Sequence, residues 1–255
     1  MKKYLAIIIC VAFCFSLALS ATAITPNRFS LIIDNNYATP PEISDTWYAD
    51  AYKFCIDELF FAEATTYIND GSYKTYITNY DFIGDRLINR SDIAVVLDRY
   101  MWVGSSYFEY YYKDDTVSDK YVDVADGQYY TGSINWLTVN NITNGVGGKY
   151  FAPHRTVTRE EFATMMYRFT TSQLWMFVDT SERAPLDTFE DASSVSAWAE
   201  DAMSWAVAVG LISGKPGNLL APQDNITKHE LATIIYRFNN NVRAHEGIVG
   251  WGEPD

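Results

Sequence analysis

The chain has 255 residues, of which 48% are hydrophobic, and a formal net charge of −13 at pH 7. So acidic a chain is repelled by the phosphate backbone of a nucleic acid, which excludes this class of partner from our hypotheses. The same charge is typical of a soluble secreted protein, and we take this as its main explanation.

The first 23 residues are typical of a secretory signal peptide. Lys2 and Lys3 precede an apolar run from Leu5 to Leu19, and Ala21-Thr22-Ala23 offers a cleavage site with small residues. The alternative is a membrane anchor, but the run is shorter than the roughly 20 residues that a spanning helix needs. We therefore predict a mature chain without a membrane span. Cleavage removes two lysines and no acid, which moves the formal charge from −13 to −15.

The next predicted element is a helix from Trp47 to Leu59, after an N-terminal linker over residues 24–42. It contains Cys55, which is the single cysteine of the mature chain, so no intramolecular disulfide can form. An apolar helix favours a buried small hydrophobe at Cys55 over a nucleophile. A Tyr- and Thr-rich insertion follows at residues 62–80.

Three segments of 19 residues then repeat along the chain without gaps. They are FIGDRLINRSDIAVVLDRY from Phe82, FAPHRTVTREEFATMMYRF from Phe151 and LAPQDNITKHELATIIYRF from Leu220. Equivalent residues lie 69 positions apart, which is the spacing of a tandem structural repeat. Two cationic positions recur at this spacing: Arg90, Arg159 and Lys228, and Arg99, Arg168 and Arg237.

Each segment begins with the signature of a helix start. A side chain suited to the N-cap is followed three residues later by an acid, which is the pattern of a capping box. The pairs are Asn89 with Asp92, Thr158 with Glu161, and Thr227 with Glu230. Apolar residues then recur at helical spacing, so each segment predicts one helix with a single apolar stripe. Such stripes need partners, and we expect the helices to pack on one another or on the helices before them.

A second helix and a glycine turn precede the capped helix. In the last unit the predicted helix is Trp198–Val209 and the turn is Gly210–Gly214; Trp136 and Gly145 match Trp205 and Gly214 at a spacing of 69. The last two units open with Tyr121-Val122-Asp123 and Phe189-Glu190-Asp191.

These features together resemble the S-layer homology family, with its F-x-D start, W-A helix, G-[IL]-[IL]-x-G turn, F-x-P loop and I-T-R-A-E helix start. The third unit shows them as FED, WAEDAMSWA, GLISG, LAP and ITKHE. The resemblance implies an all-α fold of three helix–loop–helix repeats packed as a pseudo-threefold bundle. The predicted order is repeat 1 at 43–102, a linker at 103–120, repeat 2 at 121–170, a linker at 171–187, repeat 3 at 188–240 and a disordered tail at 241–255. Repeat 1 departs most, since its F-x-D is reduced to Ile43-Ser44-Asp45.

The recurring cation is the first residue of each capped helix, where its charge adds to the positive helix end and its free N–H groups. This pattern predicts an anion site. The resemblance implies that the anion belongs to secondary cell-wall polysaccharide, often pyruvylated, bound between adjacent repeats. Carried over by position, the ligand-binding candidates are Arg90, Arg159, Lys228, Asp123, Asp191, Trp198, Gly145 and Gly214. Lys228 replaces the family arginine and His229 the small residue after it, which puts the third groove in doubt.

Structural roles compete with these assignments. Arg159 could be a solvated residue or a partner of Glu160 or of an acid in another repeat, and Asp123 and Asp191 could cap the helices that follow them. Tryptophans at helical spacing, namely Trp136, Trp198 and Trp205, favour the core over a sugar platform.

The sequence offers no catalytic motif, metal site or cofactor site. Asp119, Asp123 and Asp126 resemble a calcium loop but lack its terminal bidentate acid. The first hypothesis is therefore anchoring to the bacterial cell wall. A surface lattice or protein–protein assembly with self-association is the alternative, and an enzyme acting on the wall is the least favoured.

Overall fold

The computed structural model describes residues 30–32, 46–57, 63–69, 72–79, 84–102, 120–174 and 178–243. The chain divides into two compact units, one of Met1–Asn36 with Glu63–Asn79 and one of Tyr37–Ala62 with Tyr80–Asp255. The predicted signal peptide, the residues Ile43-Ser44-Asp45 and almost all of the predicted linker 103–120 lie outside the described residues.

The larger unit is helical. Its described α-helices are α2 (Ala49–Asp57), α3 (Arg90–Trp102), α5 (Thr131–Val139), α6 (Arg159–Gln173), α7 (Glu200–Ala208) and α8 (Lys228–Arg237). A short 3₁₀-helix, η2 (Ala192–Ser194), precedes α7, and a π-helix, η3 (Phe238–Arg243), continues α8. The all-α class predicted for the repeats is confirmed.

The smaller unit holds a three-stranded sheet, which the sequence analysis did not assign. Its strands are β1 (Ser30–Ile32), β2 (Glu63–Asn69) and β3 (Ser72–Asn79), in the order β1-β3-β2. β2 runs antiparallel to β3 and β1 runs parallel to it. The insertion at residues 62–80 thus supplies two strands, consistent with the preference of Thr and Tyr for strands, and adds a small sheet to the predicted helical fold.

The three capped helices begin where the sequence predicts. In α6 the Thr158 side chain accepts a hydrogen bond from the Glu161 N–H and the Glu161 side chain accepts one from the Thr158 N–H. Thr227 and Glu230 form the same capping box in α8. In α3, Asn89 Oδ1 accepts from the Asp92 N–H at 2.8 Å. Side-chain oxygens therefore satisfy amides that a helix start would otherwise leave unpaired.

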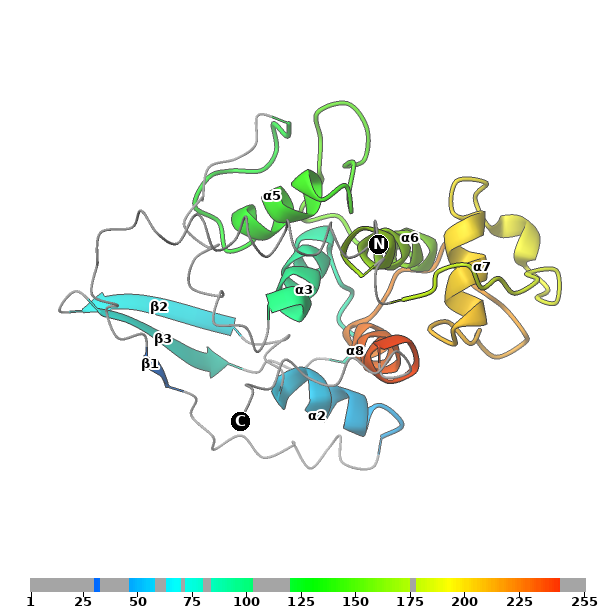
Figure 1. The fold of residues 1–255 in the computed structure, drawn as a ribbon, viewed down its shortest axis with the longest axis horizontal. Helices are drawn as coiled ribbons and strands as arrows, with labels where there is room; N and C mark the ends of the chain where they lie inside the picture. The colour runs from blue at the N-terminus through cyan, green and yellow to red at the C-terminus, as the bar shows by residue number, and fades with distance from the viewer. Residues whose placement is uncertain are drawn as a thin grey trace, which may run out of the picture. The chain divides into compact units, whose positions relative to one another are not determined.

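Each capped helix packs against the first helix of another repeat. α3 contacts α5, α6 contacts α7, and α8 contacts α2. Figure 1 shows α3, α6 and α8 grouped within the helical unit, with these partners around them. The apolar stripe of one repeat is thus covered by the next repeat, and that of the last repeat by the first. The predicted helix Trp47–Leu59 is observed as the shorter α2, and it covers α8 although its predicted repeat is degenerate.

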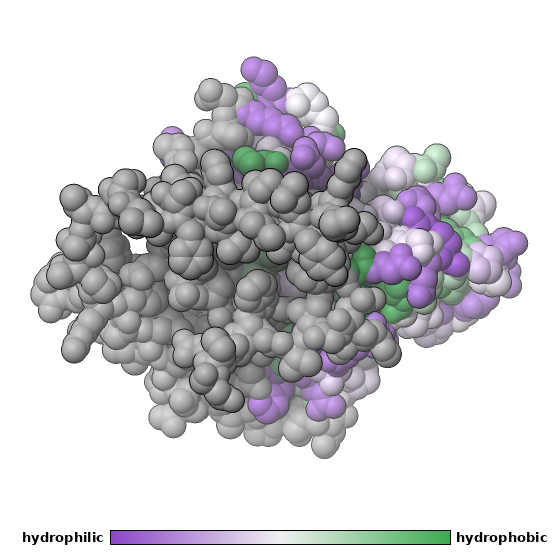
Figure 2. All heavy atoms as spheres, viewed as in Figure 1, coloured by the Kyte–Doolittle hydropathy of each residue, from purple (hydrophilic) through white to green (hydrophobic). Residues whose placement is uncertain are grey.

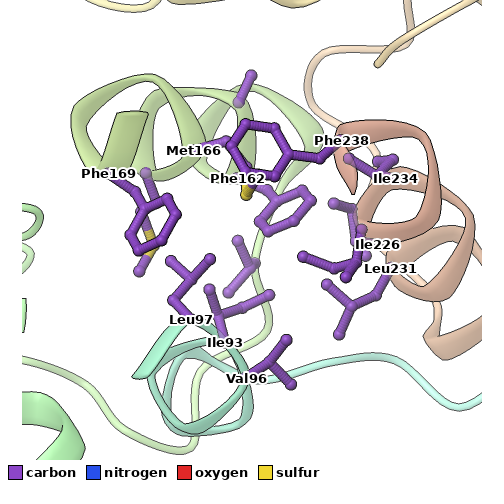
Figure 3. Close-up of a cluster of buried hydrophobic side chains, with 14 of the residues drawn as sticks. Ile93, Val96, Leu97, Phe162, Met166, Phe169, Ile226, Leu231, Ile234 and Phe238 are labelled. Carbon is purple, nitrogen blue, oxygen red and sulfur yellow. The ribbon is translucent and has the colours of Figure 1, made fainter. Parts of the chain in front are cut away.

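The core lies where the three capped helices face one another. Figure 3 shows side chains from all three pointing into the same space: Ile93, Val96 and Leu97 of α3, Phe162, Met166 and Phe169 of α6, and Leu231 and Ile234 of α8 with Ile226 and Phe238. All of them are buried. Cys55 is also fully buried, which confirms its prediction as a small hydrophobic residue.

A ring of backbone hydrogen bonds joins the three repeated segments beside this core. The Val157 N–H donates to the Ile88 carbonyl at 3.1 Å, the Ile226 N–H to the Val157 carbonyl at 2.9 Å, and the Ile88 N–H to the Ile226 carbonyl at 2.9 Å. These residues are equivalent in the repeat, each directly before its N-cap. A pseudo-threefold bundle requires such a closed cycle at its centre, while the symmetry of the complete repeats stays a prediction.

Two predicted boundaries move. α6 continues to Gln173, into the predicted linker at 171–187, and η3 continues to Arg243, so residues 241–243 are helical rather than disordered. Val242 of η3 is buried, which holds this turn against the core. The rest of the predicted tail lies outside the described residues.

The described surface is mixed in character. Figure 2 shows hydrophilic residues interspersed with apolar ones over the α5 and α7 regions. Within the part of the chain that the structure describes, every helix is too short or too polar to cross a membrane.

Candidate functional site

The recurring cations are buried. Arg90, Arg159 and Lys228 open α3, α6 and α8 with exposed fractions of 4%, 5% and 8%. The reading of Arg159 as a solvated helix-start residue is therefore wrong, because its guanidinium lies inside the protein. A buried charge needs polar partners, and the chain supplies them from the adjacent repeat.

Arg159 is held by two groups of the third repeat. Its Nε donates to the Leu220 carbonyl at 3.0 Å, and its Nη1 lies 3.2 Å from Glu230 Oε1. This agrees with the expectation of a salt bridge to an acid of another repeat. The alternative partner Glu160 is engaged elsewhere, since its carboxylate accepts hydrogen bonds from Ser196 and Gln223.

Arg90 has equivalent contacts in the second repeat. Its Nε donates to the Phe151 carbonyl at 2.8 Å, and its Nη2 donates to Thr143 Oγ1 at 3.3 Å. The guanidinium also lies over the Phe151 ring, 4.7 Å from its centroid. Phe151 is the counterpart of Leu220, so both arginines reach from one repeat to the start of the Pro-containing loop of the next.

The backbone at the helix starts is already occupied. The N–H groups of Arg90, Arg159 and Lys228 donate to carbonyls of Arg155, Asp224 and Arg86, at 3.0, 2.9 and 2.9 Å. The next N–H in each helix also donates to a carbonyl of another repeat. The expectation of free N–H groups for an anion is therefore wrong, and the side chains carry the positive charge of the site.

Burial and neighbouring charges shift the pKa values of the site. Burial lowers the pKa of Arg90 and of Arg159, while Glu161 and Glu230 respectively oppose this effect. Both arginines remain charged at neutral pH. For Glu230, burial acts to raise the pKa, but the Thr227 N–H and the charges of Arg159 and Lys215 outweigh it, so the pKa lies below its ordinary value.

Asp123 and Asp191 hold loops rather than capping the helices after them. Asp191 accepts from the N–H groups of Leu220 and Ala221 at 2.7 and 2.8 Å, and Asp123 accepts from those of Phe151 and Ala152 at 2.8 and 2.7 Å. The capping alternative is wrong for Asp191, whose side chain makes no cap hydrogen bond to η2. Asp123 thus fixes the loop whose carbonyl accepts a hydrogen bond from Arg90. Asp191 does the same for the loop that binds Arg159.

Gly145 and Gly214 occupy positions where a side chain has no room. Both have a positive φ, of +76° and +81°. A Cβ on Gly145 would clash with the Tyr150 carbonyl and lie 2.7 Å from the Tyr121 ring, and a Cβ on Gly214 would lie 2.9 Å from the Phe189 ring. The turn glycines therefore have a steric reason, in addition to any contact with a ligand.

The predicted tryptophans divide into core and surface residues. Trp205 is fully buried and Trp136 packs partly buried against the core, but Trp198 is 57% exposed, so the core prediction is wrong for Trp198. Trp198 lies two residues before α7, and Trp47 lies two residues before α2. The exposed fraction of Trp47 is 67%. From the sequence, Trp47 is predicted only as the start of a helix.

A pocket of about 340 Å³ lies around Arg159. All three predicted repeats contribute to it: the second through Arg159, the first through Trp47, and the third through the glycine turn, the residues after it and α8. Its lining comprises Trp47, Arg159, Ile212, Ser213, Gly214, Lys215, Pro216, His229, Glu230, Thr233 and Arg237. The volume lies at the lower end of the range for small-ligand pockets.

The pocket brings together charges that the sequence analysis had not linked. Arg159, Lys215 and Arg237 line it, with Glu230 between the first two. The Arg237 position recurs in the repeat and could have been recognised from that spacing. Lys215 follows the glycine turn but does not recur, since Val146 is its counterpart, so no repeat signal identifies it.

Trp47 is held at the pocket by His229. The His229 ring stacks on Tyr48 at 5.1 Å and meets the Trp47 ring edge-on at 5.3 Å. His229 Nδ1 also lies 3.4 Å from Asp85 Oδ1. The residue that departs from the family motif is thus the one that docks the first repeat beside the third.

Some predicted residues stay apart from this pocket. Trp198, Arg90, Asp123 and Gly145 are not among its lining residues, and neither is Lys228, whose N–H donates to the Arg86 carbonyl. Among the described residues, no group of three or more His, Cys, Asp or Glu is arranged to hold a metal ion.

Comparison with known families identifies the repeat. The model of the S-layer homology domain matches residues 120–163 and 188–232. The chain carries the S-layer homology domain twice. The two matches are the second and third predicted repeats; the first repeat, from 43 to 102, stays a prediction. Both matches end shortly after the start of a capped helix, α6 or α8. The S-layer homology domains therefore contain Arg159, Lys228, Asp123 and Asp191.

Several curated proteins resemble the chain over part of its length. Amylopullulanase of Thermoanaerobacterium thermosulfurigenes is 27% identical over 76% of this chain and 9% of its own length. The surface-layer 125 kDa protein of Lysinibacillus sphaericus is 33% identical over 48% of this chain and 10% of its own. The cellulosome-anchoring protein of Acetivibrio thermocellus is 25% identical over 66% of this chain and 36% of its own length. The chain therefore spans only a small part of these relatives.

Two of these relatives are named for a surface layer and for anchoring. Their names agree with the predicted location at a bacterial cell surface.

Proposed function

We propose that the chain attaches non-covalently to an anionic secondary cell-wall polysaccharide, and that the pocket around Arg159 binds it. The observation that carries this proposal is the charge of the pocket. Among its described lining residues three are permanent cations and one is a carboxylate, in a chain whose formal charge is −13. Such a local reversal of charge favours an anionic ligand.

Arg159 suits a carboxylate such as that of a pyruvate ketal. The guanidinium is a planar fork whose hydrogen bonds match a carboxylate. Its Nε is fixed by Leu220 and its Nη1 by Glu230, so the side chain is held in place before a ligand arrives. A preorganised cation loses little conformational entropy on binding, which favours affinity.

The remaining walls suit the neutral part of a sugar. Trp47 presents an exposed apolar ring at one side, and Ser213 and Thr233 supply hydroxyl groups. A pocket with an aromatic wall and a few polar groups is typical of sites that orient a small ligand.

The other predicted residues take different parts in this proposal. Arg90 is the candidate for a second groove, and Lys228 for a third that involves the first repeat. Asp191 and Gly214 shape the Arg159 pocket through the loop and the turn, and Asp123 and Gly145 do the same for the Arg90 groove. Trp198 is the candidate aromatic wall beside Arg90, because it occupies the place in repeat 3 that Trp47 occupies in repeat 1.

We place the protein at the surface of a bacterium, exported by the predicted signal peptide, in an anchoring rather than a catalytic role. The enzymes among its relatives, such as the amylopullulanase, resemble it over a small part of their own length, and this chain carries the S-layer homology domain. Their activities are therefore assigned to their other parts.

Binding to purified wall sacculi tests the proposal. We expect the full chain to co-sediment with sacculi, to lose binding when the polysaccharide is stripped, and to bind more weakly when only its pyruvate is removed. Arg159→Ala should weaken binding at least tenfold. Arg183→Ala is the matched control, because Arg183 is also paired with an acid, Asp201, but lies outside the pocket.

Two results would count against anchoring. Equal binding of the wild type and of the double variant Arg90→Ala/Arg159→Ala would reject the arginines as the site. Self-association measured by sedimentation, without binding to sacculi, would favour the alternative of a surface lattice, which the surface-layer relative brings into consideration.

A further inference from the structure

The lysine in the turn of the third repeat distinguishes the Arg159 pocket from its counterpart. Lys215 directly follows Gly214 and lines the pocket. In the second repeat the equivalent position holds Val146, which is 43% exposed. A cation in one repeat and an apolar residue in the other predict different electrostatic properties for the two grooves.

Lys215 and Arg159 act on the same carboxylate oxygen. Glu230 Oε1 lies 3.2 Å from Arg159 Nη1 and 3.4 Å from Lys215 Nζ. Lys215 Nζ also lies 2.9 Å from Asp224 Oδ2, on a side chain that is 58% exposed. Two cations from different repeats therefore already hold a carboxylate between them at the pocket wall.

The second repeat shows that neutralising this glutamate does not require a lysine in the turn. There the equivalent acid, Glu161, pairs with Arg155, which occupies the position of Asp224 in the third repeat. The third repeat thus has its cation in the turn that lines the pocket and an acid where the second repeat has its cation. Neutralisation of Glu230 by itself does not explain why the cation lies on the pocket wall.

We propose that Lys215 is a specificity-determining residue of the pocket, and that with Arg159 it makes the pocket select an acidic, carboxylate-bearing sugar over the same sugar without the acid. This inference rests on the proposed function. The lysine side chain is 30% exposed, and its ammonium is a point charge on a flexible stem that can move from Asp224 to a ligand carboxylate. A neutral sugar gains nothing from this charge, so Lys215 adds to the selectivity for the acid that Arg159 provides.

Binding constants for two forms of one polymer test this inference. The probes are pyruvylated wall polysaccharide and the same polymer after acid removal of its pyruvate, titrated against the full chain. We expect Lys215→Val, which installs the residue of the second repeat, to lower affinity for the pyruvylated polymer about tenfold and to leave that for the depyruvylated polymer within about twofold. Unchanged thermal unfolding would show that the variant is folded.

Asp224→Asn tests the role of Lys215 from the opposite direction. Removing this exposed acid frees Lys215 for the ligand, so affinity for the pyruvylated polymer should rise about threefold. A Lys215→Val variant that retains the wild-type selectivity, or that loses affinity for both polymers equally, overturns the role of Lys215 and leaves anchoring intact. A wild-type chain that binds neither polymer overturns both proposals.

Discussion

The carboxylate of Asp191 accepts a hydrogen bond from the Leu220 N–H at 2.7 Å, and the Leu220 carbonyl in turn accepts one from Arg159 Nε at 3.0 Å. The residue after Leu220, Ala221, has a φ of +49°, and its N–H also donates to Asp191. The aspartate therefore stabilises a backbone conformation that is unfavourable for alanine and, through it, orients the buried arginine.

Asp191→Ala should lower the free energy of unfolding by about 3 kcal/mol, because it removes two hydrogen bonds to a charged acceptor. Urea denaturation followed by circular dichroism measures this change. Asp187→Ala, at an exposed position in the preceding loop, should have an effect within about 0.5 kcal/mol. Similar effects of the two substitutions would contradict the role given to Asp191.

Two glycines of the second repeat should respond to alanine in opposite directions. Gly145→Ala should cost at least about 2 kcal/mol, because the residue has a φ of +76° and its Cβ would meet Tyr121 and the Tyr150 carbonyl. Gly132 lies inside α5 with nothing within 4 Å of its Cβ, so Gly132→Ala should stabilise by about 0.5–1 kcal/mol. Thermal denaturation of both variants would reveal a difference in sign, and two destabilised proteins would refute this account of the turn.

Stability should fall in acid partly because of Glu230. Its pKa in the folded protein lies below its ordinary value of 4.5, so the folded state favours the ionised form. This contribution is complete above the unfolded pKa and is lost as the pH falls from about 4.5 through the lower folded value. Urea titrations from pH 7 to pH 3 should therefore show a steeper loss for the wild type than for Glu230→Gln. Parallel curves would mean that Glu230 gains nothing from Arg159 and Thr227.

The amides of the inter-repeat ring should exchange slowly with solvent. The N–H groups of Ile88, Val157 and Ile226 each donate to a carbonyl of another repeat, so their exposure requires the repeats to separate. Hydrogen exchange followed by NMR should place these amides among the most protected in the chain. Exchange at the rate of exposed loop amides would show that the ring opens locally.

The local structure of the repeats could be read from the sequence because its causes are local. A capping box involves four consecutive residues, so Thr158 with Glu161 and Thr227 with Glu230 identified the first residues of α6 and α8. The 69-residue spacing then showed that Arg90, Arg159 and Lys228 occupy one structural position. The S-layer homology family followed from the same motifs.

Other predictions failed where the outcome depended on distant residues. The helix-start N–H groups, expected to be free, donate to carbonyls of another repeat. Trp198, expected in the core, is exposed because it precedes α7 instead of lying on its buried face. The strands of the insertion carry no helical periodicity, and their pairing is a contact between segments that the repeat alignment does not include.

By itself the sequence determined that this protein consists of helical repeats with a cation at the start of each capped helix, since capping and periodicity act over a few residues. Only the tertiary structure decided which side chains share a pocket. Trp47, Arg159 and Lys215 come from three different repeats and lie together because each capped helix is covered by the first helix of another repeat. That arrangement places Lys215 beside Arg159, although neither its spacing nor its neighbours in the sequence single it out.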